Sequence, residues 1–566
     1  MQKLFKRRDA AAAEPLPAME EYAGVPFYRR RRMNRWAKAA VYVGLGVLCV
    51  AYGFGFARFA PFLMLPFAIP IALLAILVVW ALPSGDYAPT DALQPLFIMF
   101  FGSIFLWPSY LALALPGLPW ITLLRLTGMP LLVVLLVCLS VSPQFRKNLR
   151  DIFTFDPWLF RIVMGFLILQ AVSMLYSVNP GTAANRYIVY TTNWTSIFFV
   201  SLVLFSRAGF ALRWMHLLMA GAAMICLLGV WESRALHVLW AAHIPSILKI
   251  EDESVLRTLS GTARAATGKY RVLVTYSTPL GLSEFLGLVA PFAAHMLLTS
   301  KKNAPKIFAG VYMLVAFYVV LETDSRLGLI SSILSLLLYM LFWALLQWRR
   351  SKGSIIAPAI VLAYPAIFFV GVASTFFIGR LRAKVWGNGS QSASDQSRVD
   401  QWNLAIPKMF SHPQGHGVGQ AGSVLNYIGS DGVPTIDSYF INMLLDYGFI
   451  GFALYFGMFA RGAWIGARSI VRGDLDRELQ LLLPLSICLI NYIIIKSVFS
   501  QDDNHPMVFM MLGAVVALSR RADIAAKLAG TSTFASRQLS RSARFQQPRL
   551  QPAASGLRRE SGPGRN

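Results

Sequence analysis

Long apolar runs constrain this chain more than any other feature of its sequence. Two of them, residues 61–82 and 327–346, contain no charged side chain. A helix of about 20 apolar residues crosses the roughly 30 Å of hydrocarbon in a bilayer, and both runs have about that length. The whole chain is 56% hydrophobic and only 14% charged, whereas a soluble protein has about 25% charged residues. The sequence therefore predicts an all-α, polytopic membrane protein.

The apolar segments divide the chain into spans and loops. We count about fourteen transmembrane helices, near residues 39–57, 60–82, 95–115, 121–141, 160–178, 190–206, 211–231, 276–299, 307–322, 327–347, 354–378, 437–460, 480–499 and 505–519. The expected order is a basic tail (1–38), seven spans (39–231), a periplasmic loop (232–275), four spans (276–378), a large periplasmic loop with short helices (379–436), three spans (437–519) and a basic disordered tail (520–566). Loops longer than about 12–15 residues are usually functional or disordered, and the tryptophans and turns in these two favour function.

The net charge of +25 is concentrated at the two ends of the chain. Residues 1–38 contribute +6 and residues 520–566 contribute +8. Basic residues mark the cytoplasmic side of membrane helices, where they also meet anionic lipids. Both termini are therefore expected in the cytoplasm, and the two long loops on the opposite face. Neither tail interleaves aromatic residues in a pattern that stacks bases, so nucleic acid is not an expected partner.

A cationic cluster in the first long loop runs against this charge bias. Arg257, Arg264, Lys269 and Arg271 lie close together there, before the span that starts near residue 276. A guanidinium group grips phosphate oxygens with two parallel donors and stays charged at any working pH. Two interpretations remain open: at least one of these arginines binds an anion, or they pair with the acidic residues at 251–253.

The segment "LETDSRLGL" (321–329) joins two apolar spans through a very short outer turn. Glu322, Asp324 and Arg326 are therefore expected at the edge of the membrane. Charges at that depth are costly and are usually functional or paired. Either Arg326 faces a cavity, or it pairs locally with Asp324 or Glu322 and caps the next helix.

The second long loop contains a predicted amphipathic helix over residues 397–410. Apolar side chains recur there at a spacing of three to four, at Val399, Trp402, Ile406 and Met409. This spacing indicates a helix that lies on the membrane surface or caps the core. Pro407 is expected to end or kink the helix.

The glycine-rich stretch "HPQGHGVGQAG" (412–422) follows this helix. Four glycines in eleven residues allow tight turns and a close approach to a ligand. His412 and His416 are four residues apart, but Pro413 and Gly415 argue against a helix between them, and no third metal ligand is evident. A structural turn, a substrate contact and, least favoured, a zinc site all remain open.

The stretch "DSYFINMLLDYGFIG" (437–451) opens a predicted span with a carboxylate. An aspartate at this place accepts hydrogen bonds from first-turn amides and suits the positive end of the helix dipole. Asp437 therefore either caps the helix or takes part in the chemistry of a site. Asp446 lies nine residues further on, where it serves packing or forms a second polar position.

Four stretches together resemble the O-antigen ligase and O-antigen polymerase superfamily of bacterial polysaccharide assembly. They are "RAATGKYRVLVTYSTPLGLSEFLGLVAPF" (264–292), "TDSRLGL" (323–329), "SRVDQWNLAIPKMFSHPQGHGVGQAG" (397–422) and "DSYFINMLLDYGFIG". They cover roughly residues 260–455, whereas the first 200 residues match only as apolar spans. The resemblance implies a multi-pass protein of the bacterial inner membrane.

The resemblance also implies roles for individual residues. Outer-face arginines in this family are thought to hold the pyrophosphate of a polyprenyl-linked glycan such as an undecaprenyl diphosphate. That role maps most naturally onto Arg264 and Arg326, with Arg257, Arg271 and Arg398 in support; His412 and His416 are further candidates for substrate contact.

One position departs from the ligase pattern. Ligases of the family typically have a His-Asn or His-Ser pair, then nine residues, then "GxxG". The spacing from Ser438 to Gly448 and Gly451 is kept here, but Asp437 occupies the histidine position. Acidic residues at this place look more like the repeat-unit polymerases, including those of exopolysaccharide systems.

The expected function is an inner-membrane glycosyltransferase that polymerises polyprenyl-diphosphate-linked repeat units of O-antigen, capsule or exopolysaccharide on the periplasmic face. Asp437 is the candidate base, and arginines supply the electrostatic stabilisation without a metal or another cofactor. Expected partners are the glycan donor, the acceptor, membrane lipids and other assembly proteins.

Two alternatives stay open: a ligase that caps lipid A or another acceptor, and a lipid-linked oligosaccharide flippase. A flippase should have several cations within its spans, whereas the outer polar groups here lie in two loops, which favours an enzyme.

Overall fold

Long helices dominate the computed structural model, which describes residues 74–85, 88–114, 121–250, 268–350, 355–379, 392–429, 435–471 and 475–545, besides a few isolated positions. Within these ranges, ten helices are long and apolar enough to cross a membrane. The prediction of a polytopic α-helical membrane protein is confirmed. The count of fourteen is not, and the expected spans 39–57 and 60–82 lie mostly outside the described residues.

The ten candidate spans are formed by the following helices. They are α6 (Leu123–Val141), α8 (Pro157–Ser173), α9 (Pro180–Tyr190) continued by α10 (Ser196–Phe205), α11 (Phe210–Ala235), α13 (Pro279–Thr299), α14 (Asn303–Glu322), α15 (Arg326–Arg350), α16 (Ile356–Phe377), α20 (Tyr439–Val471) and α21 (Leu482–Lys496). A π-helical turn at Thr191–Thr195 joins α9 to α10. The other described helices are α5 (Leu93–Leu106), α7 (Pro143–Phe155), α18 (Ser392–Ser411), α19 (Ala421–Leu425) and α22 (His505–Phe545), with single 3-10 turns at Met174–Tyr176, Ala241–His243 and Leu479–Leu481.

Several helices begin with a capping side chain followed by proline. Asp156 accepts a hydrogen bond from the N–H of Leu159 at the start of α8, and Thr278 accepts one from Gly281 at the start of α13. Such caps satisfy amides that have no partner within the helix, and proline fits the first helical position because it has no N–H to satisfy. These local signals set where the spans start.

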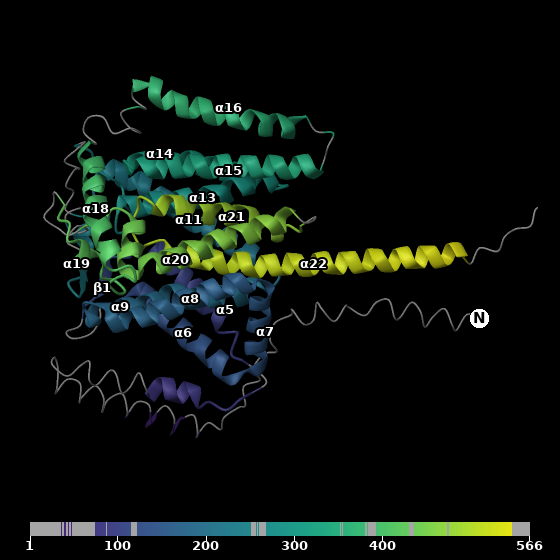
Figure 1. The fold of residues 1–566 in the computed structure, drawn as a ribbon, viewed down its shortest axis with the longest axis horizontal. Coiled ribbons are helices and arrows are strands. Elements are labelled where there is room, and N and C mark those ends of the chain that lie inside the picture. Colours follow the sequence, from purple (N-terminus) through teal and green to yellow (C-terminus); the bar gives the residue numbers. More distant parts are fainter. Residues whose placement is uncertain are drawn as a thin grey trace, which may run out of the picture.

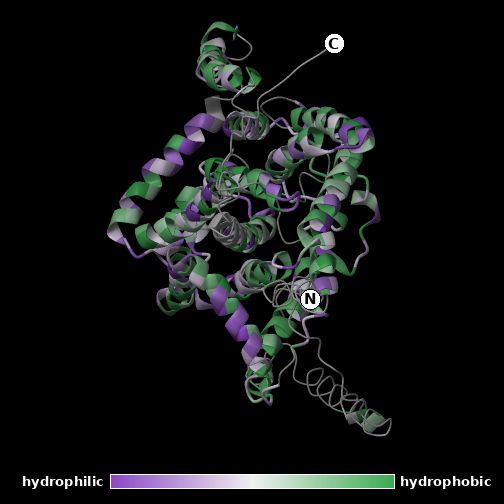
Figure 2. Ribbon diagram, turned by 90° about the vertical axis from the view of Figure 1, so that its right-hand side faces the viewer, coloured by the Kyte–Doolittle hydropathy of each residue, from purple (hydrophilic) through white to green (hydrophobic). Residues whose placement is uncertain are grey.

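The long helices lie side by side and form one bundle (Figure 1). In its interior α20 packs on α21 and α8, α10 packs on α22, and α13 packs on α14 and α15. At one end, called here the α18 end, α18 crosses the bundle, and α19 and β1 lie near it. α16 lies at the edge against α15, with few buried side chains. Figure 2, a view from the opposite end, shows mostly hydrophobic residues along these helices.

A small antiparallel sheet is the exception to the all-α prediction. It consists of β1 (Leu111–Leu113), β2 (Ile121–Thr122) and β3 (Leu248–Ile250) in the order β2-β1-β3. The helix in the expected span 95–115 is shorter than predicted: α5 ends at Leu106, and β1 occupies the end of that range. Trp107 has extended backbone angles, since the proline at 108 disfavours a helical conformation for the residue before it.

Two other segments differ from expectation in length. α22 continues to Phe545, so residues 520–545 are helical, although this tail was expected to be disordered. α18 spans Ser392–Ser411 and is therefore longer than the predicted helix 397–410. It also continues through Pro407, which neither ends nor interrupts it.

The buried face of α18 also differs from the predicted one. Among residues 395–411, the buried side chains are those of Gln401, Ala405 and Met409, each four residues apart, whereas Val399 and Ile406 are 52% and 44% exposed. α18 packs on α20. The helix thus covers the end of the bundle with one face and leaves an apolar side uncovered.

Candidate functional site

Two arginines from different helices meet one carboxylate at the α18 end of the bundle. Arg326 is the first residue of α15, and its Nη2 and Nη1 atoms lie 2.9 and 3.4 Å from the two carboxylate oxygens of Asp395. Arg398, one turn further along α18, places its Nη1 atom 3.2 Å from the same carboxylate. Two guanidinium groups held by one carboxylate keep their donors oriented in a small volume.

Asp437 lies within electrostatic reach of Arg398. Its backbone N–H donates to the Oε1 atom of Gln401 on α18, at 2.9 Å. Burial raises the pKa of the Asp437 carboxyl, while the positive charge of Arg398 and a hydrogen bond with Gln401 oppose that rise. We call Arg326, Asp395, Arg398 and Asp437 the arginine–aspartate cluster; three of its four members are predicted site residues.

Arg271 lies beside the turn that leads into Arg326. Its Nε atom donates to the carbonyl oxygen of Thr323 at 2.8 Å, and the N–H of Val272 donates to the carbonyl oxygen of Glu322. The segment that contains Arg271 therefore lies against the end of α14 and the turn before α15. Arg257 and Arg264, and the acidic residues at 251–253, lie outside the described residues, so their predicted roles stay predictions.

The segment with Arg271 is itself fixed by a buried carboxylate of α11. Glu232 accepts hydrogen bonds from the backbone N–H groups of Leu273 and Val274, both at 2.9 Å, and from the Tyr270 hydroxyl. Three donors satisfy this carboxylate, which is fully buried. The segment from Tyr270 to Val274, which includes Arg271, is thus tied to α11 through Glu232.

The glycine-rich stretch 412–422 docks on the first third of α20. The carboxylate of Asp446 accepts hydrogen bonds from three successive backbone N–H groups, those of Gly419, Gln420 and Ala421, at 2.9, 2.8 and 2.6 Å. Asp446 is 1% exposed. It therefore anchors the glycine-rich stretch, as the structural-turn interpretation predicts, and its role in packing is clear.

Gly448 interrupts α20 where this stretch meets it. Its φ of 66° and ψ of −168° are not helical. A Cβ atom there would lie 2.0 Å from the carbonyl oxygen of Pro413. Only glycine fits this backbone conformation and this close approach. The predicted span 437–460 is therefore two helical pieces, Tyr439–Tyr447 and Phe449–Val471, joined at Gly448.

His412 and His416 lie together on the docked stretch. Their ring centroids are 4.5 Å apart, and the Nδ1 atom of His416 lies 3.1 Å from the carbonyl oxygen of Leu445. Partial burial lowers the pKa of His416, and the neighbouring His412 adds to that shift. No group of three His, Cys, Asp or Glu side chains that could hold a metal occurs among the described residues. Contact of the histidines with substrate stays a prediction.

The sequence analysis did not single out Asp395, the fourth member of the cluster, or Gln401, which binds the backbone of Asp437. Both read as ordinary polar residues of a surface helix. A signal was present, because Asp395, Arg398 and Gln401 are three residues apart and so share one side of α18. The sequence does not show that this side of α18 meets the start of α15, because Arg326 lies about seventy residues before Asp395 in the chain.

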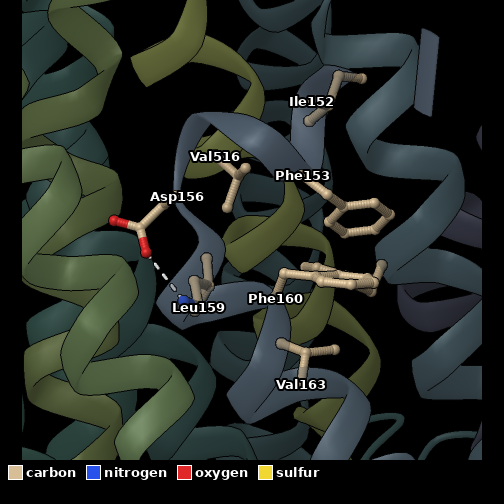
Figure 3. Close-up of a pocket in the computed structure, with 8 residues that line it drawn as sticks. Ile152, Phe153, Asp156, Leu159, Phe160, Val163 and Val516 are labelled. Carbon is tan, nitrogen blue, oxygen red and sulfur yellow. Dashed lines mark hydrogen bonds between the residues drawn. The ribbon is translucent and has the colours of Figure 1, made fainter. Parts of the chain in front are cut away.

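A small cavity elsewhere is a poor candidate for the site. It has a volume of about 10 Å³ and lies between the start of α8 and neighbouring helices, lined by Ile152, Phe153, Asp156, Leu159, Phe160, Val163, Phe198 and Val516 (Figure 3). Such a volume accommodates about one water molecule. Its one carboxylate, Asp156, caps α8 and pairs with Arg461 at 2.8 Å, so its role is structural.

Comparison with known proteins identifies the segment that contains the cluster. No curated protein is a significant match to the chain. Residues 311–456 match the family model of the O-antigen ligase domain, and this range includes every member of the arginine–aspartate cluster and the docked glycine-rich stretch. The match confirms the predicted resemblance: over residues 311–456 this multi-pass membrane protein is similar to the O-antigen ligases.

Proposed function

We propose that the protein is a glycosyltransferase of the bacterial inner membrane that polymerises polyprenyl-diphosphate-linked oligosaccharide repeat units on the periplasmic face. The observation that supports this proposal most is the convergence of Arg326 and Arg398 beside Asp437, at the end of the bundle where α18 lies. The family match supports the reaction class.

The two arginines hold the diphosphate of the donor. Two guanidinium groups offer bidentate hydrogen bonds to phosphate oxygens and keep their charge. Asp395 orients both groups before substrate arrives, and the Nε atom of Arg398 is buried without a hydrogen-bond partner in the described part of the chain. Arg271 lies beside the turn that precedes Arg326, where it donates to the carbonyl oxygen of Thr323. Arg264 and Arg257 belong to the same loop and are assigned to the donor in the proposal.

Asp437 accepts the proton of the acceptor hydroxyl. The hydroxyl oxygen attacks the anomeric carbon of the donor sugar, and the bond from that carbon to the diphosphate oxygen breaks. The leaving polyprenyl diphosphate takes the electron pair, and its new negative charge is stabilised by Arg326 and Arg398. A raised pKa makes the Asp437 carboxylate a stronger base than a fully solvated aspartate.

The reaction is proposed to be independent of a metal ion, because cations of the protein stabilise the leaving group. A chelator such as EDTA should then leave the rate unchanged, whereas a strong loss of rate that magnesium restores would contradict this part of the proposal.

Asp437 also favours a polymerase over a ligase, since ligases typically have histidine at this place. The test is an assay with purified protein in proteoliposomes and lipid-linked repeat units. The wild-type protein should produce a ladder of polymers, and Asp437→Asn should abolish it at normal protein level. Transfer to lipid A without a ladder would assign a ligase, and translocation of unpolymerised substrate would assign a flippase.

A further inference from the structure

A second polar cluster lies inside the bundle, between α13 and α21. Lys496, the last residue of α21, and Glu284 of α13 form an ion pair with 3.0 Å between Nζ and Oε2. Both side chains are 0% exposed, and both belong to candidate membrane spans. Ionisable residues at such places are costly and usually functional, and a buried ion pair stabilises a fold no better than apolar residues of the same volume. Stability alone therefore does not explain the pair.

The ammonium group of Lys496 also holds the turn that follows α21. Its Nζ atom donates a hydrogen bond to the carbonyl oxygen of Gln501, five residues further on. The rings of Tyr439 and Tyr492 lie 5.5 and 5.4 Å from the same atom. Lys496 thus fixes the turn 497–501 over the end of its own helix and contacts α20 directly.

The same turn is bonded to the residues on either side of Asp437. The hydroxyl of Ser438 donates to the carbonyl oxygen of Ser497 at 2.6 Å. The hydroxyl of Ser500 donates to the carbonyl oxygen of Ile436. The backbone at Asp437 is therefore held from two directions, by Gln401 on α18 and by the turn that Lys496 fixes.

We propose that Lys496, held in place by Glu284, is a positioning residue for Asp437: it fixes the turn 497–501, and the turn fixes the backbone on both sides of the proposed base. This inference rests on the proposed function of Asp437. A displacement of about 1 Å caused far from the reacting atoms can lower a rate by about 100-fold, so a loose turn should slow the chemical step while the arginines still bind the donor.

The experiment compares Lys496→Met with Arg521→Met in the proteoliposome assay. Arg521 forms a similar, largely buried ion pair with Glu478, at 2.8 Å. That pair lies at the other end of the bundle, where Glu478 also binds the N–H of Gly209 before α11. Lys496→Met should lower kcat about tenfold or more, with the KM for the donor changed less than about twofold. Arg521→Met should lose a similar amount of thermal stability and keep kcat.

A double variant covers the case in which Lys496→Met does not fold. Ser438→Ala with Ser500→Ala removes the two hydrogen bonds to the turn and leaves the ion pair intact, and it should lower kcat in the same way. Wild-type kcat in Lys496→Met or in this double variant, or an equal loss in Arg521→Met, would overturn the inference. If Asp437→Asn itself kept full kcat, the proposed function would fail, which is a separate and distinguishable result.

Discussion

At the scale of single residues, the environment of Asp437 predicts how the rate depends on pH. Burial raises the pKa of this carboxyl, and Arg398 opposes the rise. A base must be ionised, so the rate should fall as the pH drops through the raised pKa. Arg398→Met removes the opposing charge and should move this acid limb to higher pH. Weaker donor binding would instead lower the rate by the same factor at every pH.

The measurement is kcat against pH for the wild-type protein and for Arg398→Met, each scaled to its own maximum. Arg213→Met is the matched control, because Arg213 is exposed near the start of α11, at the end of the bundle away from α18. The control should leave the acid limb where it is. An acid limb that does not move in Arg398→Met would remove Asp437 from the role of base.

At the scale of elements, the break in α20 predicts an unequal effect of two glycine substitutions. Alanine at Gly448 meets the carbonyl oxygen of Pro413 and is strained at a φ of 66°, and such strain costs about 1–3 kcal/mol before the clash is counted. Gly310 within α14 has no atom near a new Cβ, so alanine there should be neutral or stabilise by up to about 1 kcal/mol. Thermal unfolding in detergent measures both. Equal melting temperatures for the two variants would show that the glycine-rich stretch does not dock at Gly448.

The elements also show which parts of the site a sequence can predict. Spans, the short turn before Arg326 and a helix around residue 400 follow from local periodicity and charge. The buried side of α18 does not, because Gln401 is buried through its contact with Asp437, which lies 36 positions further along the chain. The prediction that Pro407 ends or kinks the helix is wrong for a similar reason: packing of Ala405 and Met409 against the bundle outweighs the local cost of proline.

The contact between Lys496 and Glu284 also could not be predicted from the sequence. The two residues are 212 positions apart, on spans that periodicity places in the membrane without saying which neighbour each one faces. Each looks like an isolated charge near a helix end or within an apolar run. Only their contact, and the bond from Lys496 to Gln501, shows that they fix one turn.

At the scale of the whole molecule, positive charge and the position of the cluster predict one orientation. The α18 end should face the periplasm, and the opposite end, with α7 and its exposed basic side chains, should face the cytoplasm. Cysteine labelling tests this directly. Cys138, Cys226 and Cys488 are free and buried, and replacing all four cysteines of the chain gives a clean background.

In that background, Ser411→Cys and Lys147→Cys are a matched pair, since both positions are exposed, one at the end of α18 and one on α7. A membrane-impermeant maleimide added to intact spheroplasts should label Ser411→Cys and should reach Lys147→Cys only after the membrane is permeabilised. Equal labelling after permeabilisation controls for the reactivity of each thiol. The reverse pattern would place the arginine–aspartate cluster on the cytoplasmic face, away from the proposed periplasmic substrates, and would refute the polymerase proposal as a whole, whatever the single-residue variants show.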